Sequence, residues 1–173
     1  MKIFLSGYMG SGKSVVAKQL AEISGFPIID LDDQIIIIEG NSIADVFQKK
    51  GELYFRKLET RVLEDVLEEP ASLIVALGGG TPCYGTNLDL IKSFTECKLI
   101  YLKASVEFLV KRLFNEKEKR PMISHLQTMN DLEDFVRKHL FERGYYYSQS
   151  NLVVNVENKS PKEIAAEIIE KLK

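Results

Sequence analysis

The segment Lys2-Ile3-Phe4-Leu5-Ser6 runs directly into Gly7-Tyr8-Met9-Gly10-Ser11-Gly12-Lys13-Ser14. The second part fits the pattern G-x-x-x-x-G-K-S/T, the phosphate-binding P-loop. The apolar run before it predicts a buried strand, and the apolar residues of 15–23 have helical spacing. A glycine-rich turn could match by chance, but here the motif lies between a strand and a helix, the context that it requires. The sequence therefore predicts nucleotide binding.

Each residue type in the motif has a chemical reason. Glycines let the backbone turn its N–H groups inward around an anion, at the positive end of the following helix. The Lys13 ammonium can reach the β- and γ-phosphates, and the Ser14 hydroxyl can bind Mg²⁺. The predicted nucleotide-binding residues of this segment are Gly10, Ser11, Gly12, Lys13, Ser14 and Val15.

Length and composition favour one globular domain over residues 1–173. A net charge of −2 gives no reason to expect a nucleic acid or an acidic membrane as partner. The chain enters a strand at its first residues and has no apolar run of about 20 residues, so neither a signal peptide nor a membrane span is expected. Cys83 and Cys97 have no metal-type spacing, which favours reduced thiols in the cytoplasm. Without a coiled-coil pattern, we expect a monomer.

Strand and helix patterns alternate along the chain, which predicts an α/β fold with about five parallel strands between helices. After the first strand, the predicted strands are 26–30, 72–77, 98–102 and 152–156. The predicted helices after the first are 31–39, 42–50, 52–67, 87–94, 105–114, 131–147 and 160–172.

Two segments leave alternatives open. The run Ile35 to Ile38 is interpreted as the buried part of a short helix, although four isoleucines suit a strand equally well. The charged residues 115–121 fit a solvated loop or a mobile lid over a phosphate site, and composition does not decide between them.

In open α/β sheets, ligands bind at the carboxyl ends of the strands, and two more strand ends carry chemistry here. Asp30 and Asp32 follow the second strand, where one could face Mg²⁺ and the other a substrate hydroxyl. A helix cap and a first-turn acid would be the plain alternative. Gly78, Gly79 and Gly80 follow the third strand, where a tight turn would need only one glycine. Without side chains there, a small ligand could approach the backbone closely.

Three arginines are further candidates, although a single arginine is usually a solvated surface residue. Arg56 is one helical turn from Glu59, which could hold its guanidinium, and Arg120 lies in the suspected lid. Arg143 precedes Gly144 and three tyrosines, interpreted as packing at a helix end. His125 and His139 have no metal-ligand partner at a useful spacing, so no role is predicted for them.

Together these motifs resemble the shikimate kinase family over almost the whole chain, in order and with similar spacing. The matching segments are 7–14, 30–32, 42–47, 51–56, 77–80, 120–121 and 142–147. The resemblance implies a P-loop kinase fold that uses ATP and Mg²⁺ to phosphorylate the 3-hydroxyl of shikimate, in the chorismate route to aromatic amino acids. It also implies a substrate-binding segment at about residues 31–60 and a lid at about 112–124.

The resemblance assigns a role to each matching residue. It makes Ser14 and Asp30 the magnesium groups, Asp32 the base at the reacting hydroxyl, and Lys13 and Arg120 the cations at the phosphates. The residues that it places around shikimate are Asp32, Phe47, Phe55, Arg56, Gly78, Gly79, Gly80 and Arg143. The arginines would hold the substrate carboxylate, which suits the planar guanidinium fork.

The chain departs from the family pattern at two places. Lys159 stands in the loop where the family often has an arginine near the adenine, and Gly144-Tyr145 follows Arg143 where the family tends to carry a proline. A gluconate kinase remains an alternative, because its substrate is also a polyol carboxylate. A nucleotide-binding module without activity would have lost Lys13, Asp32 or Arg120, and all three are present.

Overall fold

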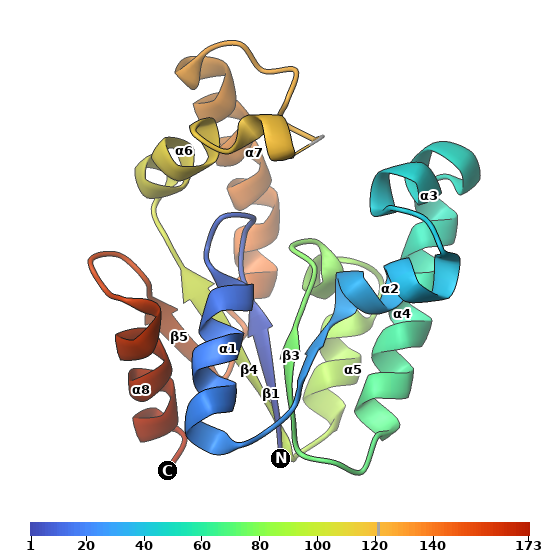
Figure 1. Cartoon of the computed structure of the whole chain (residues 1–173), viewed down its shortest axis with the longest axis vertical. Helices are drawn as coiled ribbons and strands as arrows, with labels where there is room; N and C mark the ends of the chain where they lie inside the picture. The colour runs from blue at the N-terminus through green and yellow to red at the C-terminus, as the bar shows by residue number, and fades with distance from the viewer. Residues whose placement is uncertain (121) are drawn as a thin grey trace.

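The computed structural model, which describes residues 1–120 and 122–173, contains a five-stranded parallel sheet in the order β2-β3-β1-β4-β5 (Figure 1). The strands are β1 (Lys2–Ser6), β2 (Ile28–Asp30), β3 (Leu73–Ala76), β4 (Cys97–Lys103) and β5 (Leu152–Asn155). The helices are α1 (Lys13–Ser24), α2 (Leu31–Glu39), α3 (Ile43–Lys50), α4 (Glu52–Glu68), α5 (Asn87–Ser93), α6 (Val106–Phe114), α7 (Met129–Tyr147) and α8 (Pro161–Lys171). The predicted α/β class and parallel sheet are confirmed.

The central strand β1 is buried on both faces, as parallel strands in such folds are. Side chains alternate along it, so Ile3 and Leu5 join the core formed with α1 and α8, whereas Phe4 joins the core formed with α4 and α5. Figure 1 shows these helix pairs on opposite sides of the sheet. The P-loop therefore follows a strand that is fully buried at the centre of the sheet.

The expected helix starts and ends are set by local chemistry. The hydroxyl of Ser42 accepts from the Asp45 amide at the start of α3, and Ser105 and Ser160 cap α6 and α8 in the same way. Gly25 ends α1 with φ 74°, a left-handed conformation that glycine adopts without strain.

The expectation for Ile35 to Ile38 is half right. The segment is helical, within α2, but only Ile35 is buried, while Ile37 is 72% and Ile38 55% exposed. The reason is geometric, because Leu31 and Ile35, four residues apart, lie on the face of α2 that packs inward, and the isoleucines after Ile35 point to other faces.

The two segments expected to surround the site lie at the carboxyl end of the sheet (Figure 1). Residues 31–60 form α2, α3 and the start of α4. The expected lid, 112–124, leaves α6 and contains a short 3₁₀ turn at Lys117–Lys119, and Ile123 is buried in the core next to α7. Pro121, part of the expected lid, lies outside the described residues. Among the described residues, no helix has the length and apolar character of a membrane span.

Candidate active site

The P-loop folds back on itself and carries Lys13 at the first position of α1. Gly10 and Gly12 have φ values of 82° and 94°, which favour glycine, and the Ser11 amide donates to the carbonyl of Tyr8 over 3.1 Å. The Lys13 ammonium donates to the carbonyl oxygens of Gly7 and Tyr8, at 2.9 and 3.3 Å. Backbone carbonyl groups of the P-loop thus hold the lysine ammonium in place.

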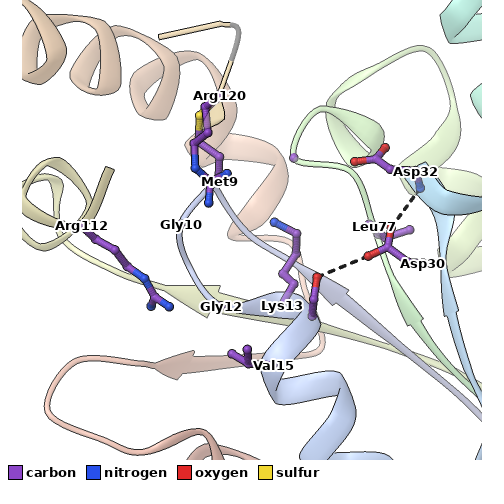
Figure 2. A pocket seen from close by; sticks show the side chains of 12 residues that line it. Met9, Gly10, Gly12, Lys13, Val15, Asp30, Asp32, Leu77, Arg112 and Arg120 are labelled. Atoms are coloured by element: carbon purple, nitrogen blue, oxygen red, sulfur yellow. Dashed lines mark hydrogen bonds between the residues drawn. The ribbon is translucent and has the colours of Figure 1, made fainter. Parts of the chain in front are cut away.

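Asp30 links the second strand to the P-loop. Its Oδ2 accepts from the Ser14 hydroxyl over 3.3 Å, and its Oδ1 accepts from the Asp32 amide over 3.1 Å (Figure 2). Asp30 therefore caps α2, which is the plain alternative from the sequence, and also meets the P-loop serine.

Burial and neighbouring charges shift the pKa values of Lys13 and Asp32. Burial lowers the pKa of Lys13 to about 8, against the opposing fields of Asp32 and Asp30. Burial, reinforced by the neighbouring Asp30 and Glu59 carboxylates, raises the pKa of Asp32 to about 6, against the opposing field of Lys13. At neutral pH the lysine is still mainly charged and the aspartate is mainly a carboxylate, each easier to neutralise than in water.

A cavity of about 300 Å³ brings together residues from the P-loop, β2, the glycine turn and the lid. Figure 2 shows Arg112 and Arg120 near the P-loop on one side and Asp30 and Asp32 on the other. The residues that line this cavity are Met9, Gly10, Gly12, Lys13, Ser14, Val15, Asp30, Asp32, Leu77, Gly79, Arg112 and Arg120.

A second cavity, of about 470 Å³, adjoins the first at Gly12, Val15 and Arg112. Ser11, Phe108, Asn158 and Pro161 also line it, as does Lys159, whose ammonium donates to Glu167 over 2.7 Å. A phosphate chain in the first cavity and an attached base in the second would account for both.

Arg56 is held on the far side of the glycine turn. Its Nη1 donates to Glu59 over 2.8 Å, as the sequence predicts, and Glu59, only 1% exposed, also accepts from the Thr81 hydroxyl over 2.6 Å. A Cβ on Gly80 would lie 2.8 Å from the Arg56 guanidinium, and a Cβ on Gly78 would lie 2.9 Å from Asp32. The absence of these side chains is what makes room for the two charged groups.

Arg143 approaches the same turn from α7. Its guanidinium lies 5.7 Å from the ring centre of Tyr8, and a Cβ on Gly79 would be 3.6 Å from its Nη1. Tyr147, one turn further along, is fully buried and donates its hydroxyl to the Gly79 carbonyl. Of the three tyrosines, Tyr147 fits the expected packing role, whereas Tyr145 is 71% exposed.

The sequence-predicted residues are thus divided between two neighbouring areas. Within the described part of the chain, Phe47, Phe55, Arg56 and Arg143 line neither of the two cavities. The phenylalanine rings pack on each other with centroids 4.5 Å apart, beside Arg56. Cys83 and Cys97 are free thiols, and burial raises the pKa of Cys83 to about 11.

Sequence reasoning missed Arg112, which lines both cavities. It is one of two basic residues in the last turn of α6, where helices commonly carry them, so no pattern sets it apart. Thr81 and Tyr8 were also missed, because their partners Glu59 and His139 are distant in the sequence.

The donor set suits Mg²⁺. Ser14 and Asp30 offer a hydroxyl and a carboxylate, hard oxygen ligands whose side chains already meet. Across residues 1–120 and 122–173, no group of three or more acidic, cysteine or histidine side chains could form a metal cage. A site with few protein ligands fits Mg²⁺, which keeps water and phosphate oxygens as its other ligands.

A P-loop follows the central strand of a parallel sheet and faces a carboxylate of raised pKa and an arginine on a mixed-charge segment. This arrangement defines a P-loop phosphotransferase. The shikimate kinase family model matches residues 9–173. The shikimate kinases of Flavobacterium johnsoniae and Flavobacterium psychrophilum are 40% and 41% identical to this chain, covering 98% and 96% of it and 97% and 96% of their own lengths. The chain belongs to the shikimate kinase family.

Solved structures agree with this assignment. Shikimate kinase from Acinetobacter baumannii in complex with shikimate is 30% identical and has a TM-score of 0.86, covering 99% of this chain and 92% of its own. Shikimate kinase from Bacteroides thetaiotaomicron, also 30% identical, has a TM-score of 0.87 and covers 99% and 97%. The P-loop kinase fold is thereby confirmed.

Proposed function

We propose that this chain transfers the γ-phosphoryl group of ATP to the 3-hydroxyl of shikimate, giving shikimate 3-phosphate for the chorismate route. The main support for this proposal is that phosphate-binding and carboxylate-binding candidates lie on either side of the glycine turn. Lys13 and Asp32 line the cavity on one side of Gly79, while Arg56 and Arg143 pack against Gly80 and Gly79 themselves. Phosphate-binding and carboxylate-binding groups are therefore neighbours.

At the phosphate end, Lys13 and the inward N–H groups of residues 10–15 bind the nucleotide phosphates. Charge spreads over the phosphoryl oxygens in the transition state, so a cation fixed beforehand stabilises it more than the ground state. Arg120, held by Glu116 over 2.9 Å, supplies a second cation from the lid. Arg112 and Lys159 flank the base in the second cavity.

Ser14 and Asp30 would hold Mg²⁺, which neutralises phosphate charge when it is bound. The direct contact between the two side chains supports this assignment.

Asp32 accepts the proton of the shikimate hydroxyl. A pKa of about 6 leaves it mainly as a carboxylate at pH 7 and makes it a better proton acceptor than an ordinary aspartate. The Asp30 cap on the Asp32 amide fixes the start of α2, and so fixes where the carboxylate lies.

Arg56 and Arg143 bind the shikimate carboxylate, and Phe47 and Phe55 form the apolar wall beside Arg56. Glu59 orients Arg56 through a buried ion pair, which reduces the conformational freedom that substrate binding must remove. Gly78, Gly79 and Gly80 leave the backbone open to the ligand.

We further propose one catalytic domain over residues 1–173, with 31–60 as substrate-binding segment and 112–124 as lid. A monomer is proposed because one chain supplies every group named above. The cytoplasm is proposed because ATP is available there.

A coupled assay of ADP release tests this function with shikimate, gluconate and nucleoside monophosphates as acceptors. Of these acceptors, we expect only shikimate to be phosphorylated. Arg56→Lys should raise the KM for shikimate while leaving the KM for ATP unchanged. Lysine keeps the charge but lacks the planar fork, so it is a matched probe of carboxylate geometry. Comparable turnover with gluconate would contradict the proposal, as would an effect of Arg56→Lys on ATP alone.

A further inference from the structure

Tyr8 occupies a variable position of the P-loop pattern, yet it is nearly inaccessible, with 1% of its surface exposed. Its hydroxyl is hydrogen-bonded to Nδ1 of His139 over 3.1 Å, and the two rings meet edge to face with centroids 6.1 Å apart. His139 belongs to α7, 131 residues further along the chain. A loop that binds phosphate is thus tied directly to a distant helix.

The same ring also supports Arg143. The guanidinium carbon lies 5.7 Å from the Tyr8 centroid, within the range of a cation–π contact. His139 and Arg143 are four residues apart on α7, so they lie on one face of the helix. Tyr8 therefore contacts two successive turns of α7, through its hydroxyl and through its ring.

Both members of the hydrogen bond are neutral near pH 7. Burial raises the pKa of Tyr8 to about 12, with the Arg143 charge opposing, and burial together with Arg143 and Lys138 lowers the pKa of His139, with Glu142 opposing. The tyrosine can then donate to an uncharged imidazole. A neutral His139 also avoids repelling Arg143 one turn away.

We propose that Tyr8 is a positioning residue. The contacts of its ring and of its hydroxyl with α7 hold the guanidinium of Arg143 in the position that binds the substrate. The inference rests on the proposed role of Arg143 in binding the shikimate carboxylate. It adds a link between the two halves of the site, because the residue that places Arg143 is part of the phosphate-binding loop. The Lys13 ammonium donates to the Tyr8 carbonyl, so the same residue also contacts the phosphate-binding cation.

The ring and the hydroxyl can be tested separately. Tyr8→Leu removes both, and we expect the KM for shikimate to rise by roughly 3- to 30-fold, the range that a cation–π contact covers. Tyr8→Phe keeps the ring, so it should restore most of this loss. The KM for ATP should change less than about twofold in both variants, since the backbone of the P-loop makes the phosphate contacts.

The hydrogen bond is tested from the other side. His139→Asn keeps a polar atom near the position of Nδ1 and should resemble the wild type, whereas His139→Leu leaves the buried tyrosine hydroxyl unpaired. Combining His139→Leu with Tyr8→Phe removes both partners, so its effect on the KM should be smaller than the sum of the single effects. Phe135→Leu is the matched control, because Phe135 packs on His139 at 4.2 Å without a described contact to Arg143. It should lower the melting temperature without changing the KM for shikimate.

The outcomes separate this inference from the proposed function. If Arg143→Lys raises the KM for shikimate but Tyr8→Leu, while folded, does not, the link is wrong and the function stands. If Arg143→Lys changes nothing, the proposed role of Arg143 fails and the inference fails with it. Equal changes in the KM values for shikimate and ATP would show that Tyr8 only stabilises the P-loop.

Discussion

The position of Arg56 can be tested without changing the arginine, through Gly80. A Cβ built on Gly80 would lie 2.8 and 2.9 Å from the two terminal nitrogens of Arg56 and 3.2 Å from Cζ. The backbone of Gly80 has φ −94° and ψ −14°, which alanine adopts freely, so Gly80→Ala strains no dihedral angle. The three nearest atoms to this Cβ all belong to the Arg56 guanidinium, which must therefore move away.

The size of the effect follows from this overlap. Ordinary van der Waals contact begins near 3.4 Å, so the guanidinium must withdraw by about 0.6 Å, or turn out of its ion pair with Glu59. Misplacing a binding group by about 1 Å can cost 10²-fold in rate, and a hydrogen bond to a charged group contributes about 1.5–3 kcal/mol. We therefore expect kcat/KM for shikimate to fall by roughly 10- to 100-fold, with the KM for ATP unchanged.

Steady-state kinetics with each substrate varied in turn measures this effect, and thermal unfolding shows whether the fold persists. Gly144→Ala is the matched control, because a Cβ there meets no atom within 4 Å although Gly144 is next to Arg143. Within helix α7, it should leave the kinetics unchanged and stabilise the protein by about 0.5–1 kcal/mol. If Gly80→Ala folds and binds shikimate as the wild type does, Arg56 does not hold the substrate from its present position.

Four further predictions concern the phosphate site and the lid. Lys13→Ala should lower kcat by at least about 10²-fold, measured by ADP release. A variant that keeps more than a tenth of the wild-type rate would contradict the role assigned to Lys13. Asp30→Asn should move the magnesium midpoint of the reaction to higher concentration, while Asp32→Asn should leave it in place and lower kcat by roughly 10²–10⁴-fold; equal shifts of the midpoint would refute this division. Because the pKa of Asp32 rises to about 6 from 3.8 on folding, its ionisation costs stability progressively as the pH rises from about 4 to 6. Asp32→Asn should therefore raise the free energy of unfolding at pH 7, by about 1–3 kcal/mol, and have little effect below about pH 4, which urea unfolding at the two pH values measures. Amide exchange in residues 115–120 and 122–124 should slow when an ATP analogue and shikimate bind, and equal protection with and without them would exclude a closing lid.

The sequence predicted those features that are encoded locally. The P-loop and Asp30 at the end of the second strand are short-range signals, and each lies where the sequence predicted it. The ion pair of Arg56 with Glu59 was also predictable, because residues three apart on a helix are neighbours.

Features that depend on packing between distant segments were not predictable. The strand order β2-β3-β1-β4-β5 depends on which side each crossover helix takes, and a single sequence holds no local signal for that. The exposure of Ile37 and Ile38 depends on which face of α2 meets α4, which four identical residues cannot indicate. Arg112 and His139 gain their surroundings only when α6 and α7 pack over the P-loop.

The electrostatics of the site explain why Lys13 and Asp32 belong together. Burial disfavours the charge of each. Among neighbouring charges, Asp32 does most to favour the charged form of Lys13, and Lys13 favours the ionised form of Asp32. In the proposed mechanism, a phosphate chain next to Lys13 would add negative charge that favours the charged lysine, and Mg²⁺ beside Asp30 would offset that charge at Asp32. Nucleotide binding would then keep Lys13 a cation while Asp32 stays mainly a carboxylate that can accept a proton. The two groups to which we assign phosphoryl transfer would both have the charge state that their roles require.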